Sequence, residues 1–424
     1  MDIDFPTTKV EDVAAPEDSS IAIGPFGSDM KSDCYVDEGV PVIRGSNINS
    51  GRSFDGDFVF ITEAKADELA SSNVFPGDLV FPHRGAIGEV GLIPKDVSRD
   101  RWMLSSSLMK LTPDEDKVSP EFLYYYFCSD QGKHELLKKA STVGTPGIGS
   151  PLSSLRDAEV PCPSLPVQRR IAGILGAYDD LIANNRRRIE VLEEMATAIF
   201  REWFVHYRFP GHADAAMRET EIGAVPDAEG WTVKPIGELA TSPRSRVDPD
   251  EMDPDTPYFG LGDMPKESIA LSEWGRAEDA GSKKYSFDRG DILFGKIRPY
   301  FHKVGPAPVA GICSTDAIVI VPNTNELWGF VLGHVSSDGF VELADQTSSG
   351  TKMPRAKWKI LKEEYKVAVP PPPILQQFND TIKNLVDQIH NLIYRNHTLR
   401  KTRDLLLPRL VSGKVEVDTT AAIA

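Results

Sequence analysis

The chain has 424 residues, of which 41% are hydrophobic and 26% are charged. This is enough apolar side chain for two or three ordinary cores, since single domains mostly stop at about 100–200 residues. A disulfide miniprotein and a disordered tail are therefore excluded. The longest aliphatic run, residues 317–321, is far shorter than the roughly 20 residues that cross a bilayer. Residues 1–16 are acidic, unlike a signal peptide, so we expect a soluble, cytoplasmic protein.

The net charge of −16 argues at first against a nucleic-acid partner, because phosphate contacts need Lys and Arg. The charge is unevenly spread along the chain. Two acidic stretches, residues 1–165 and 211–369, alternate with two nearly neutral ones, residues 166–210 and 370–424. Any DNA contact must then be local, or be shared with a basic partner.

The chain repeats itself in order. The run 75–81 recurs at 287–294 and the run 181–185 recurs at 392–396, while 41–48 is loosely echoed at 257–264. Pro113 and Pro322 each follow a strand-like run, and all four matches have nearly the same offset. One such match could be chance, but four in order indicate two copies of a unit of about 210 residues.

Each copy begins with a part rich in Gly, Pro and short aliphatic runs, which predicts short strands between turns. This part also contains a short helix in copy one, where Ser119 is a candidate N-cap and Pro120 stands at the first helical position. A proline-rich stop follows, at residues 161–166 in copy one and 370–373 in copy two. Each copy then ends in one long helix.

The two long helices carry the spacing of a coiled-coil seam, with core positions alternately four and three residues apart. In copy one the seam reads Ile171, Leu175, Tyr178, Ile182, Asn185, Ile189, Leu192, Ala196, Ile199 and Trp203. In copy two it reads Phe378, Ile382, Leu385, Ile389, Leu392, Asn396, Leu399, Arg403, Leu406 and Leu410. Pro408 is expected to end or kink the second helix near its last turn.

Two interpretations of these helices remain open. Each could pack only on the core of its own domain, as amphipathic helices commonly do. The length, the narrow stripe and the Asn in each seam favour pairing of the two helices with each other, because a buried seam Asn selects register and partner. We hypothesise that they run antiparallel and hold two globular parts at a fixed separation.

No motif for catalysis or metal binding is present. The chain has no phosphate loop, no dinucleotide-binding glycine motif, no H-E-x-x-H and no Asn/Asp-Pro-Pro-aromatic tetrapeptide of amino-methyltransferases. The four cysteines lie far apart, and the eight histidines show no ligand spacing. Residues 113–117 superficially resemble a nuclease motif, but five consecutive residues in a turn cannot share a metal as separate strands can. We expect no catalysis, no metal and no cofactor in this chain.

Several runs resemble one family, the DNA-specificity (S) subunits of Type I restriction-modification systems. The resemblance extends over nearly the whole chain, through runs at residues 24–28, 39–45, 77–81, 84–88, 166–171, 181–185, 192–194, 200–204, 222–226 with Trp231, 405–410 and 412–414. Copy two departs from the pattern where residues 374–378 replace the usual Gln-x-x-Ile entry to the long helix. It departs again where residues 296–298 stand in place of residues 84–86.

The resemblance implies an α+β fold with an internal pseudo-twofold repeat. Two similar mixed α/β target recognition domains, residues 1–163 and 211–372, would be joined by two long helices, residues 164–210 and 373–424, that form an antiparallel coiled coil. It also implies that the chain reads a bipartite double-stranded DNA site. Its partners would be two methyltransferase (M) subunits that bind S-adenosylmethionine, and restriction (R) subunits that use ATP and Mg. The chain itself would be a non-catalytic reader.

Base-reading residues should be basic or amide groups on Gly-rich or Thr-rich loops, since Arg and Lys pair with guanine and Asn with adenine in the major groove. The candidates in copy one are Arg44, Asn47, Arg84, Thr142 and Thr145. The candidates in copy two are Lys296, Arg298, Tyr300, Lys352 and Arg355. The loops 142–147 and 347–355 are the better candidates as groups, because each lies just upstream of its proline-rich helix entry.

A second class of function stays open at this point. The same architecture could be a scaffold whose two modules bind proteins rather than DNA, and the acidic charge is its best support. A stand-alone enzyme is opposed by the missing motifs. Copurification with a methyltransferase and salt-sensitive binding to one bipartite duplex would separate the first two readings.

Overall fold

The computed structural model describes residues 5–48, 54, 56–95, 99–141, 144–211 and 216–418. The chain forms two compact units. Unit 1 comprises residues 1–183 and 397–424, and unit 2 comprises residues 184–396. The two longest helices, α6 (Leu165–Phe200) and α10 (Pro372–Val411), contribute residues to both units. Each unit combines one module with parts of both long helices, so the units do not test the predicted domain boundaries, which stay a prediction.

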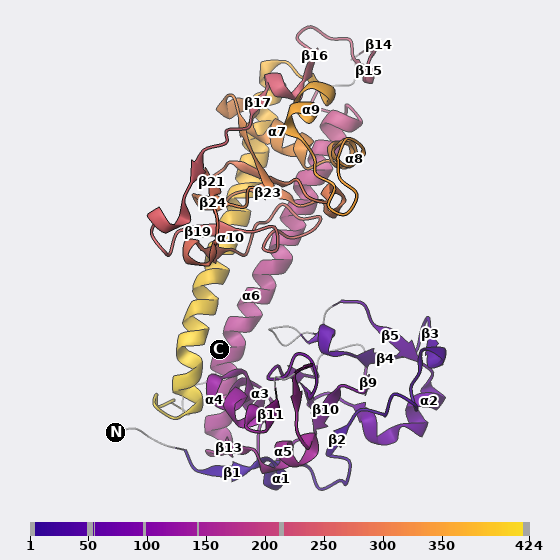
Figure 1. Cartoon of the computed structure of the whole chain (residues 1–424), viewed down its shortest axis with the longest axis vertical. Helices are drawn as coiled ribbons and strands as arrows, with labels where there is room; N and C mark the ends of the chain where they lie inside the picture. Colours follow the sequence, from indigo (N-terminus) through magenta and orange to yellow (C-terminus); the bar gives the residue numbers. More distant parts are fainter. Residues whose placement is uncertain are drawn as a thin grey trace. The chain divides into compact units, whose positions relative to one another are not determined.

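Unit 1 contains two small sheets with short helices beside them (Figure 1). The first sheet has the order β2 (Ile21–Ile23), β10 (Leu108–Leu111), β7 (Leu79–Pro82), β8 (Gly91–Leu92). The second has the order β3 (Tyr35–Val36), β5 (Val59–Ile61), β4 (Val40–Ile43), β9 (Trp102–Leu104), β6 (Asn73–Val74). The remaining pairs are β1 (Thr7–Lys9) with β13 (Glu159–Pro161) and β11 (Ala140–Ser141) with β12 (Gly147–Ile148). The helices are α1 (Val10–Val13), α2 (Glu63–Glu68), α3 (Pro120–Cys128), α4 (Asp130–Leu137) and α5 (Pro151–Asp157).

Unit 2 has the corresponding set of elements. Its first sheet has the order β17 (Ala240–Thr241), β25 (Ala317–Pro322), β22 (Ile292–Gly295), β23 (Val304–Pro306). Its second has the order β18 (Arg246–Val247), β21 (Lys284–Phe287), β24 (Gly311–Cys313), β19 (Pro257–Phe259), β20 (Gly275–Arg276). The remaining pairs are β16 (Thr232–Pro235) with β26 (Lys366–Val369) and β14 (Met217–Thr220) with β15 (Gly223–Pro226). The helices are α7 (Trp328–Val335), α8 (Asp338–Gln346) and α9 (Trp358–Glu364).

The strand pairing confirms the predicted duplication. In both units the first sheet has the same order and antiparallel pairing, and the second sheet is built around one parallel pair, β4 with β9 in unit 1 and β19 with β24 in unit 2. The helices α3, α4 and α5 reappear in the same order as α7, α8 and α9. The units differ at one edge of the second sheet. Unit 1 adds β3 beside β5, whereas unit 2 adds β18 beside β21 at the opposite edge.

The short helix α3 begins as its sequence predicts. Pro120 is its first residue and the Ser119 hydroxyl accepts a hydrogen bond from Phe122 N, so the side chain caps a free backbone donor. Gln168 of α6 then fixes this helix end, because its Oε1 accepts from Ser119 N at 2.8 Å and it is fully buried. In unit 2 the Asn379 side chain of α10 accepts from Gly329 N of α7 at 2.8 Å. A long-helix amide thus holds the start of α3 in unit 1 and of its counterpart α7 in unit 2.

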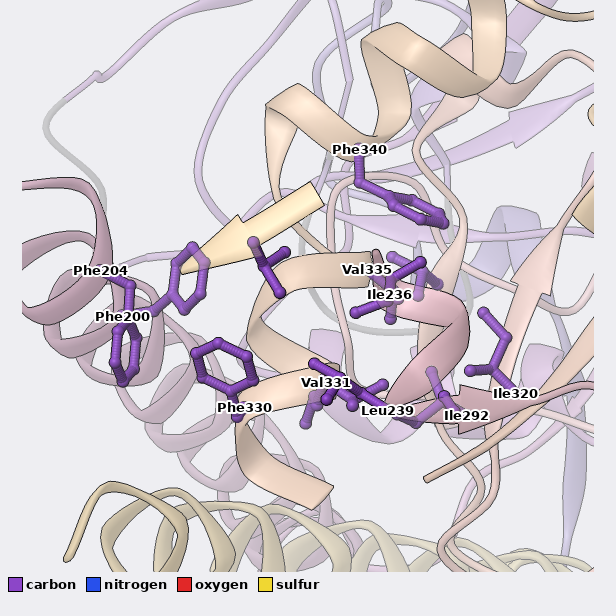
Figure 2. Close-up of a cluster of buried hydrophobic side chains, with 14 of the residues drawn as sticks. Phe200, Phe204, Ile236, Leu239, Ile292, Ile320, Phe330, Val331, Val335 and Phe340 are labelled. Atoms are coloured by element: carbon purple, nitrogen blue, oxygen red, sulfur yellow. The ribbon is translucent and has the colours of Figure 1, made fainter. Parts of the chain in front are cut away.

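The core of unit 2 is aromatic where α6 meets the module. Figure 2 shows Phe200 and Phe204 beside Phe330 of α7, and the Phe204 and Phe330 rings are 4.9 Å apart in an edge-on contact. His334 lies in the same cluster, with its ring 4.9 Å from that of Phe200. Burial lowers the pKa of His334 to about 3, so the imidazole is neutral.

The two long helices run antiparallel within each unit. In unit 2, Asn185 of α6 donates a 2.8 Å hydrogen bond to Asn396 of α10, and Phe200 contacts Phe378 at a ring distance of 6.4 Å. Residue numbers therefore rise along α6 while they fall along α10 (Figure 1). In unit 1, Asp179 is paired with Arg403, while Ile171 and Leu410 share one core cluster.

Most of the predicted seam positions are buried in the unit to which they belong. The buried members are Ile171, Leu175, Ile182, Asn185, Ile189, Ala196, Phe378, Ile382, Leu385, Ile389, Leu392, Asn396 and Leu410. Tyr178, Leu192 and Leu399 are half-buried. Pro408 lies in the last turn of α10, which ends at Val411, so the helix ends close to this proline as expected. Among the described residues, no helix is long and apolar enough to cross a membrane.

A candidate nucleic-acid interface

Three loops of unit 2 meet at one point, which we call junction 2 and define as Lys296–Arg298, Asp316 and Pro354–Ala356. Three backbone hydrogen bonds join them. Lys296 N donates to Asp316 O at 2.9 Å, Arg298 N donates to Pro354 O at 2.9 Å, and Ala356 N donates to Lys296 O at 2.9 Å. Arg355 also pairs with both Ser349 and Ile297 as isolated bridges, so its backbone is held on two sides.

Unit 1 contains the same arrangement, which we call junction 1 and define as residues 83–85, Ser107 and residues 146–148. His83 N donates to Ser107 O at 2.9 Å, Gly85 N donates to Pro146 O at 3.0 Å, and Ile148 N donates to His83 O at 3.0 Å. Gly147 bridges to Arg84 and pairs with Ser141 of β11, as Arg355 bridges to Ile297 and Ser349. The backbone of the two junctions is therefore the same.

These hydrogen bonds correct the sequence alignment of the two copies by one residue. Lys296 corresponds to His83, Ile297 to Arg84 and Arg298 to Gly85, rather than Lys296 to Arg84. The same comparison pairs Asp316 with Ser107 and Arg355 with Gly147. The junctions thus share a backbone and differ in nearly every side chain that they present.

The side chains of junction 2 form a charged cluster around Asp316. Arg355 Nε donates to Asp316 Oδ1 at 3.2 Å, and Lys296 Nζ lies 3.5 Å from the same oxygen. Lys296 Nζ also donates to Thr315 O, and the residue is half-buried. The ammonium group of Lys296 is thus held inside the junction, whereas Arg355 remains exposed.

Arg298 has a left-handed backbone conformation, with φ of 49°. Its counterpart Gly85 also has a positive φ, of 82°. A non-glycine residue there is strained by roughly 1–2 kcal/mol, so it is retained only where the surrounding contacts enforce it. The side chain is exposed, donates a long 3.4 Å hydrogen bond to Lys352 O, and stacks near Phe301. Tyr300 and Lys352 are exposed beside it.

A groove of about 330 Å³ adjoins junction 2 and is rich in positive charge. Besides Lys296 and Arg355 its walls contain three basic residues that the sequence reading missed, which are Arg244, Lys357 and Lys359. All three are exposed. Their positions in the sequence could have indicated them. Arg244 follows β17 in a Ser/Pro/Arg loop, and the two lysines flank Trp358 just after the predicted loop 347–355. This groove is a local cluster of positive charge within the acidic stretch of residues 211–369.

Junction 1 is less basic. Arg84 and Thr145 are exposed, while Thr142 lies outside the described residues. His83 is buried, and its Nε2 lies 3.1 Å from Ser106 O, just as Lys296 Nζ contacts the matching carbonyl of Thr315. Burial lowers the pKa of His83, so it adds no charge at neutral pH. Arg84 is then the cation that junction 1 presents.

Arg44 and Asn47 lie on a turn of unit 1 rather than in junction 1. Asn47 is 1% exposed, its Oδ1 accepts from Arg44 N at 2.9 Å, and its Nδ2 donates to Asp57 O at 3.3 Å. The same turn occurs in unit 2, where Asp263 accepts from Gly260 N at 2.8 Å. Since the amide of Asn47 is bonded to backbone, we do not carry it into the proposed interface. Arg44 is half-buried with its guanidinium 5.6 Å from the Tyr35 ring.

Across the described part of the chain, no group of three or more His, Cys, Asp and Glu side chains is arranged to hold a metal ion. The buried carboxylate of Glu193 is satisfied internally, because its Oε1 accepts hydrogen bonds from Ser268 Oγ, Ile269 N and Ala270 N at 2.7–2.9 Å. Desolvation raises its pKa. These bonds tie α6 to a loop of unit 2, which is a structural role.

The duplicated modules and their paired helices define a protein that presents two loop junctions with the same backbone arrangement and different side chains. Residues 27–194 and 228–396 each match the family described as "Type I restriction modification DNA specificity domain". The chain belongs to this family. The scaffold alternative, in which the modules bind only proteins, is not favoured by this membership.

Relatives and solved structures agree with that assignment. The chain is 26% identical to the Type I restriction enzyme MjaIX specificity subunit of Methanocaldococcus jannaschii, over 84% of this chain and 82% of the relative. It is 22% identical to the Type I restriction enzyme HindI specificity subunit of Haemophilus influenzae, over 87% of this chain and 94% of the relative. The crystal structure of the Type I restriction-modification S subunit from M. genitalium has the same fold, with a TM-score of 0.57, 14% identity and coverage of 98% of this chain and 97% of that one.

Proposed function

We propose that this chain is the specificity subunit of a Type I restriction-modification assembly and reads a bipartite duplex, one half-site through each module. The loops of junction 1 and junction 2 are the reading surfaces. Arg84 and Thr145 are the described candidates of the first module. Arg298, Tyr300, Lys352 and Arg355 are those of the second.

One observation carries this proposal: the same backbone junction occurs twice with different side chains. Base edges are read by side chains, whereas register on the duplex depends on backbone geometry and phosphate contacts. A reader that recognises two different half-sites therefore needs one scaffold and two sets of side chains. Pairs such as Arg355 with Gly147, and Asp316 with Ser107, fit that requirement.

The proposed partners follow from the family. Two methyltransferase subunits would supply S-adenosylmethionine and the methyl transfer, and restriction subunits would supply ATP- and Mg-dependent cleavage. This chain would contribute no catalytic group and no cofactor. The target recognition domains would span residues 1–163 and 211–372, and the helices of residues 164–210 and 373–424 would set the unread gap and dock the methyltransferases.

The acidic net charge limits how much of the phosphate contact this chain can make. The basic groove beside junction 2 offers Arg244, Lys357 and Lys359 for that role. Each phosphate neutralised by Lys or Arg makes the slope of log K against log salt more negative by about 0.9. Partner subunits must supply the remaining contacts.

The test is a duplex selection by the full chain purified with its methyltransferase partner. We expect one enriched sequence made of two short parts and an unread gap. In the variant K357A/K359A, affinity should fall equally for all duplexes and the slope of log K against log salt should become less negative by about 2. Lys362→Ala is the matched control, since this lysine lies on α9 with Lys359 but does not line the groove. Failure to enrich any duplex with the partner present would contradict the proposal.

A further inference from the structure

The contact with Asp316 orients the guanidinium of Arg355 but occupies only one of its nitrogen atoms. Only Nε takes part, at 3.2 Å from Asp316 Oδ1. The terminal nitrogens Nη1 and Nη2 make no hydrogen bond to any residue in the described part of the chain. The exposed end of the fork therefore carries two parallel donors whose direction is set by the carboxylate behind it.

Guanine is the base that matches such a fork. Its O6 and N7 atoms are two adjacent acceptors in the major groove, and a bidentate Arg contact to them is the commonest specific contact to DNA. Adenine offers one acceptor and one donor on the same edge, so an Arg fork meets a repelling N–H there. A side chain whose rotamer is already selected loses less conformational entropy when it binds.

Resting on the proposed function, we infer that Arg355, positioned by Asp316, reads a guanine in the half-site of the second module. Lys296 is the second cation on Asp316, but it is half-buried and also donates to the Thr315 carbonyl. Lys296 therefore balances the carboxylate and leaves the charge of Arg355 available to DNA. Arg355 is a base-contacting residue in this scheme, and Asp316 is a positioning residue.

Junction 1 lacks the arginine and the carboxylate that this contact needs. The residue that corresponds to Arg355 is Gly147, and the residue that corresponds to Asp316 is Ser107. The guanine read in this way should consequently occur in one half-site only. The asymmetry supplies an internal control, because the first half-site is read by the same chain in the same complex.

The experiment measures binding of the full chain, purified with its methyltransferase partner, to the selected duplex and to duplexes with single base changes. Arg355→Ala should lose about 5- to 150-fold of the preference for guanine at one position of the second half-site. Arg355→Lys should lose a smaller part of that preference, because a lysine can also pair with guanine but lacks the planar fork. Preferences in the first half-site should stay unchanged. Arg355→Lys keeps the charge and should keep the salt slope, since only the planar fork is lost.

Asp316→Asn gives a readout that a merely structural role would not. Removing a negative charge beside the duplex should strengthen binding to unrelated DNA, while loss of the orienting carboxylate should weaken the preference for guanine at the same position. Lys359→Ala is the matched control and should weaken binding to all duplexes equally. Unchanged thermal unfolding of each variant would show that the fold is retained.

Two different negative results are distinguishable. If the wild-type chain enriches no duplex, the proposed function fails. If it enriches a bipartite duplex and Arg355→Ala retains every base preference, or weakens all duplexes uniformly, the proposed function stands and the guanine assignment is overturned. A loss of preference at a base other than guanine would overturn it as well.

Discussion

The buried pair of Asn185 and Asn396 offers a quantitative test of how the two long helices are matched. Replacing Asn185 by Ala leaves the Asn396 amide buried without the 2.8 Å hydrogen bond that it accepts. An unsatisfied buried polar group costs about 1–3 kcal/mol. Ala has a better helix propensity than Asn by up to about 0.7 kcal/mol, which offsets part of that cost. With the full propensity gain subtracted, we expect Asn185→Ala to lower the free energy of unfolding by about 0.3–2.3 kcal/mol.

The matched control is Asn184→Ala, one residue earlier on α6 and exposed to solvent. It makes the same change in helix propensity without removing a buried partner, so it should be neutral or slightly stabilising. The double variant N185A/N396A removes both polar groups. It should therefore be less destabilised than the two single changes added together, with a coupling of about 0.5–1.5 kcal/mol.

Urea unfolding followed by tryptophan fluorescence is a suitable assay, because most of the signal comes from unit 2. The chain has 6 tryptophans. Those in unit 2 are Trp203, Trp231, Trp274, Trp328 and Trp358. Equal stabilities for Asn185→Ala and Asn184→Ala, or strict additivity in the double variant, would refute the reasoning that this pair specifies the register of the helices.

Three further predictions concern unit 2. Burial lowers the pKa of His334 to about 3 and of His390 to about 4, below the unfolded value of about 6.5, so the unfolded chain takes up the extra protons on acidification. The contribution of the two neutral imidazoles to the free energy of unfolding is complete above about pH 6.5. In urea titrations at pH 5 the free energy of unfolding should be lower by about 2 kcal/mol per histidine, and a free energy that does not change with pH would contradict this. Glu193→Ala should cost about 1–3 kcal/mol because it removes the acceptor of three hydrogen bonds, of whose donors Ala270 N alone keeps a second acceptor, Ser268 Oγ at 3.2 Å. An unchanged urea midpoint would show that water replaces the carboxylate. Gly305→Ala should cost about 1–3 kcal/mol in thermal unfolding, because its Cβ would lie 2.2 Å from the Ile269 carbonyl; wild-type stability would mean that β23 can shift.

The repeat and the seams of the long helices could be predicted from the sequence because both depend on spacing along the chain. Heptad positions follow from helical geometry alone, so Asn185 and Asn396 could be identified as members of the two seams before their partners were known. The same is true of Ser119 and Pro120, whose cap acts on the next turn of chain. Local rules of this kind need no knowledge of the tertiary fold.

For the proposed DNA-reading loops, the sequence predicts the approximate region of the chain but not which side chains the loops present. The correspondence of Lys296 with His83 depends on hydrogen bonds between residues 20 or more positions apart in the chain, which no local spacing reveals. For the same reason Asn47 looked like a base reader in sequence, although its amide closes a turn. Lys359 was missed because it lies on a helix that follows the loop, and only the fold places it in the groove.

The most direct measurement for the central claim is methylation mapping of DNA from cells that carry this chain with its methyltransferase partner. The wild-type chain should yield one methylated sequence in two parts, and a chain with the junction 2 loop 349–355 replaced should change the second part alone. A single uninterrupted motif, or a replacement that changes both parts together, would contradict the account of two independent readers built on one repeated backbone.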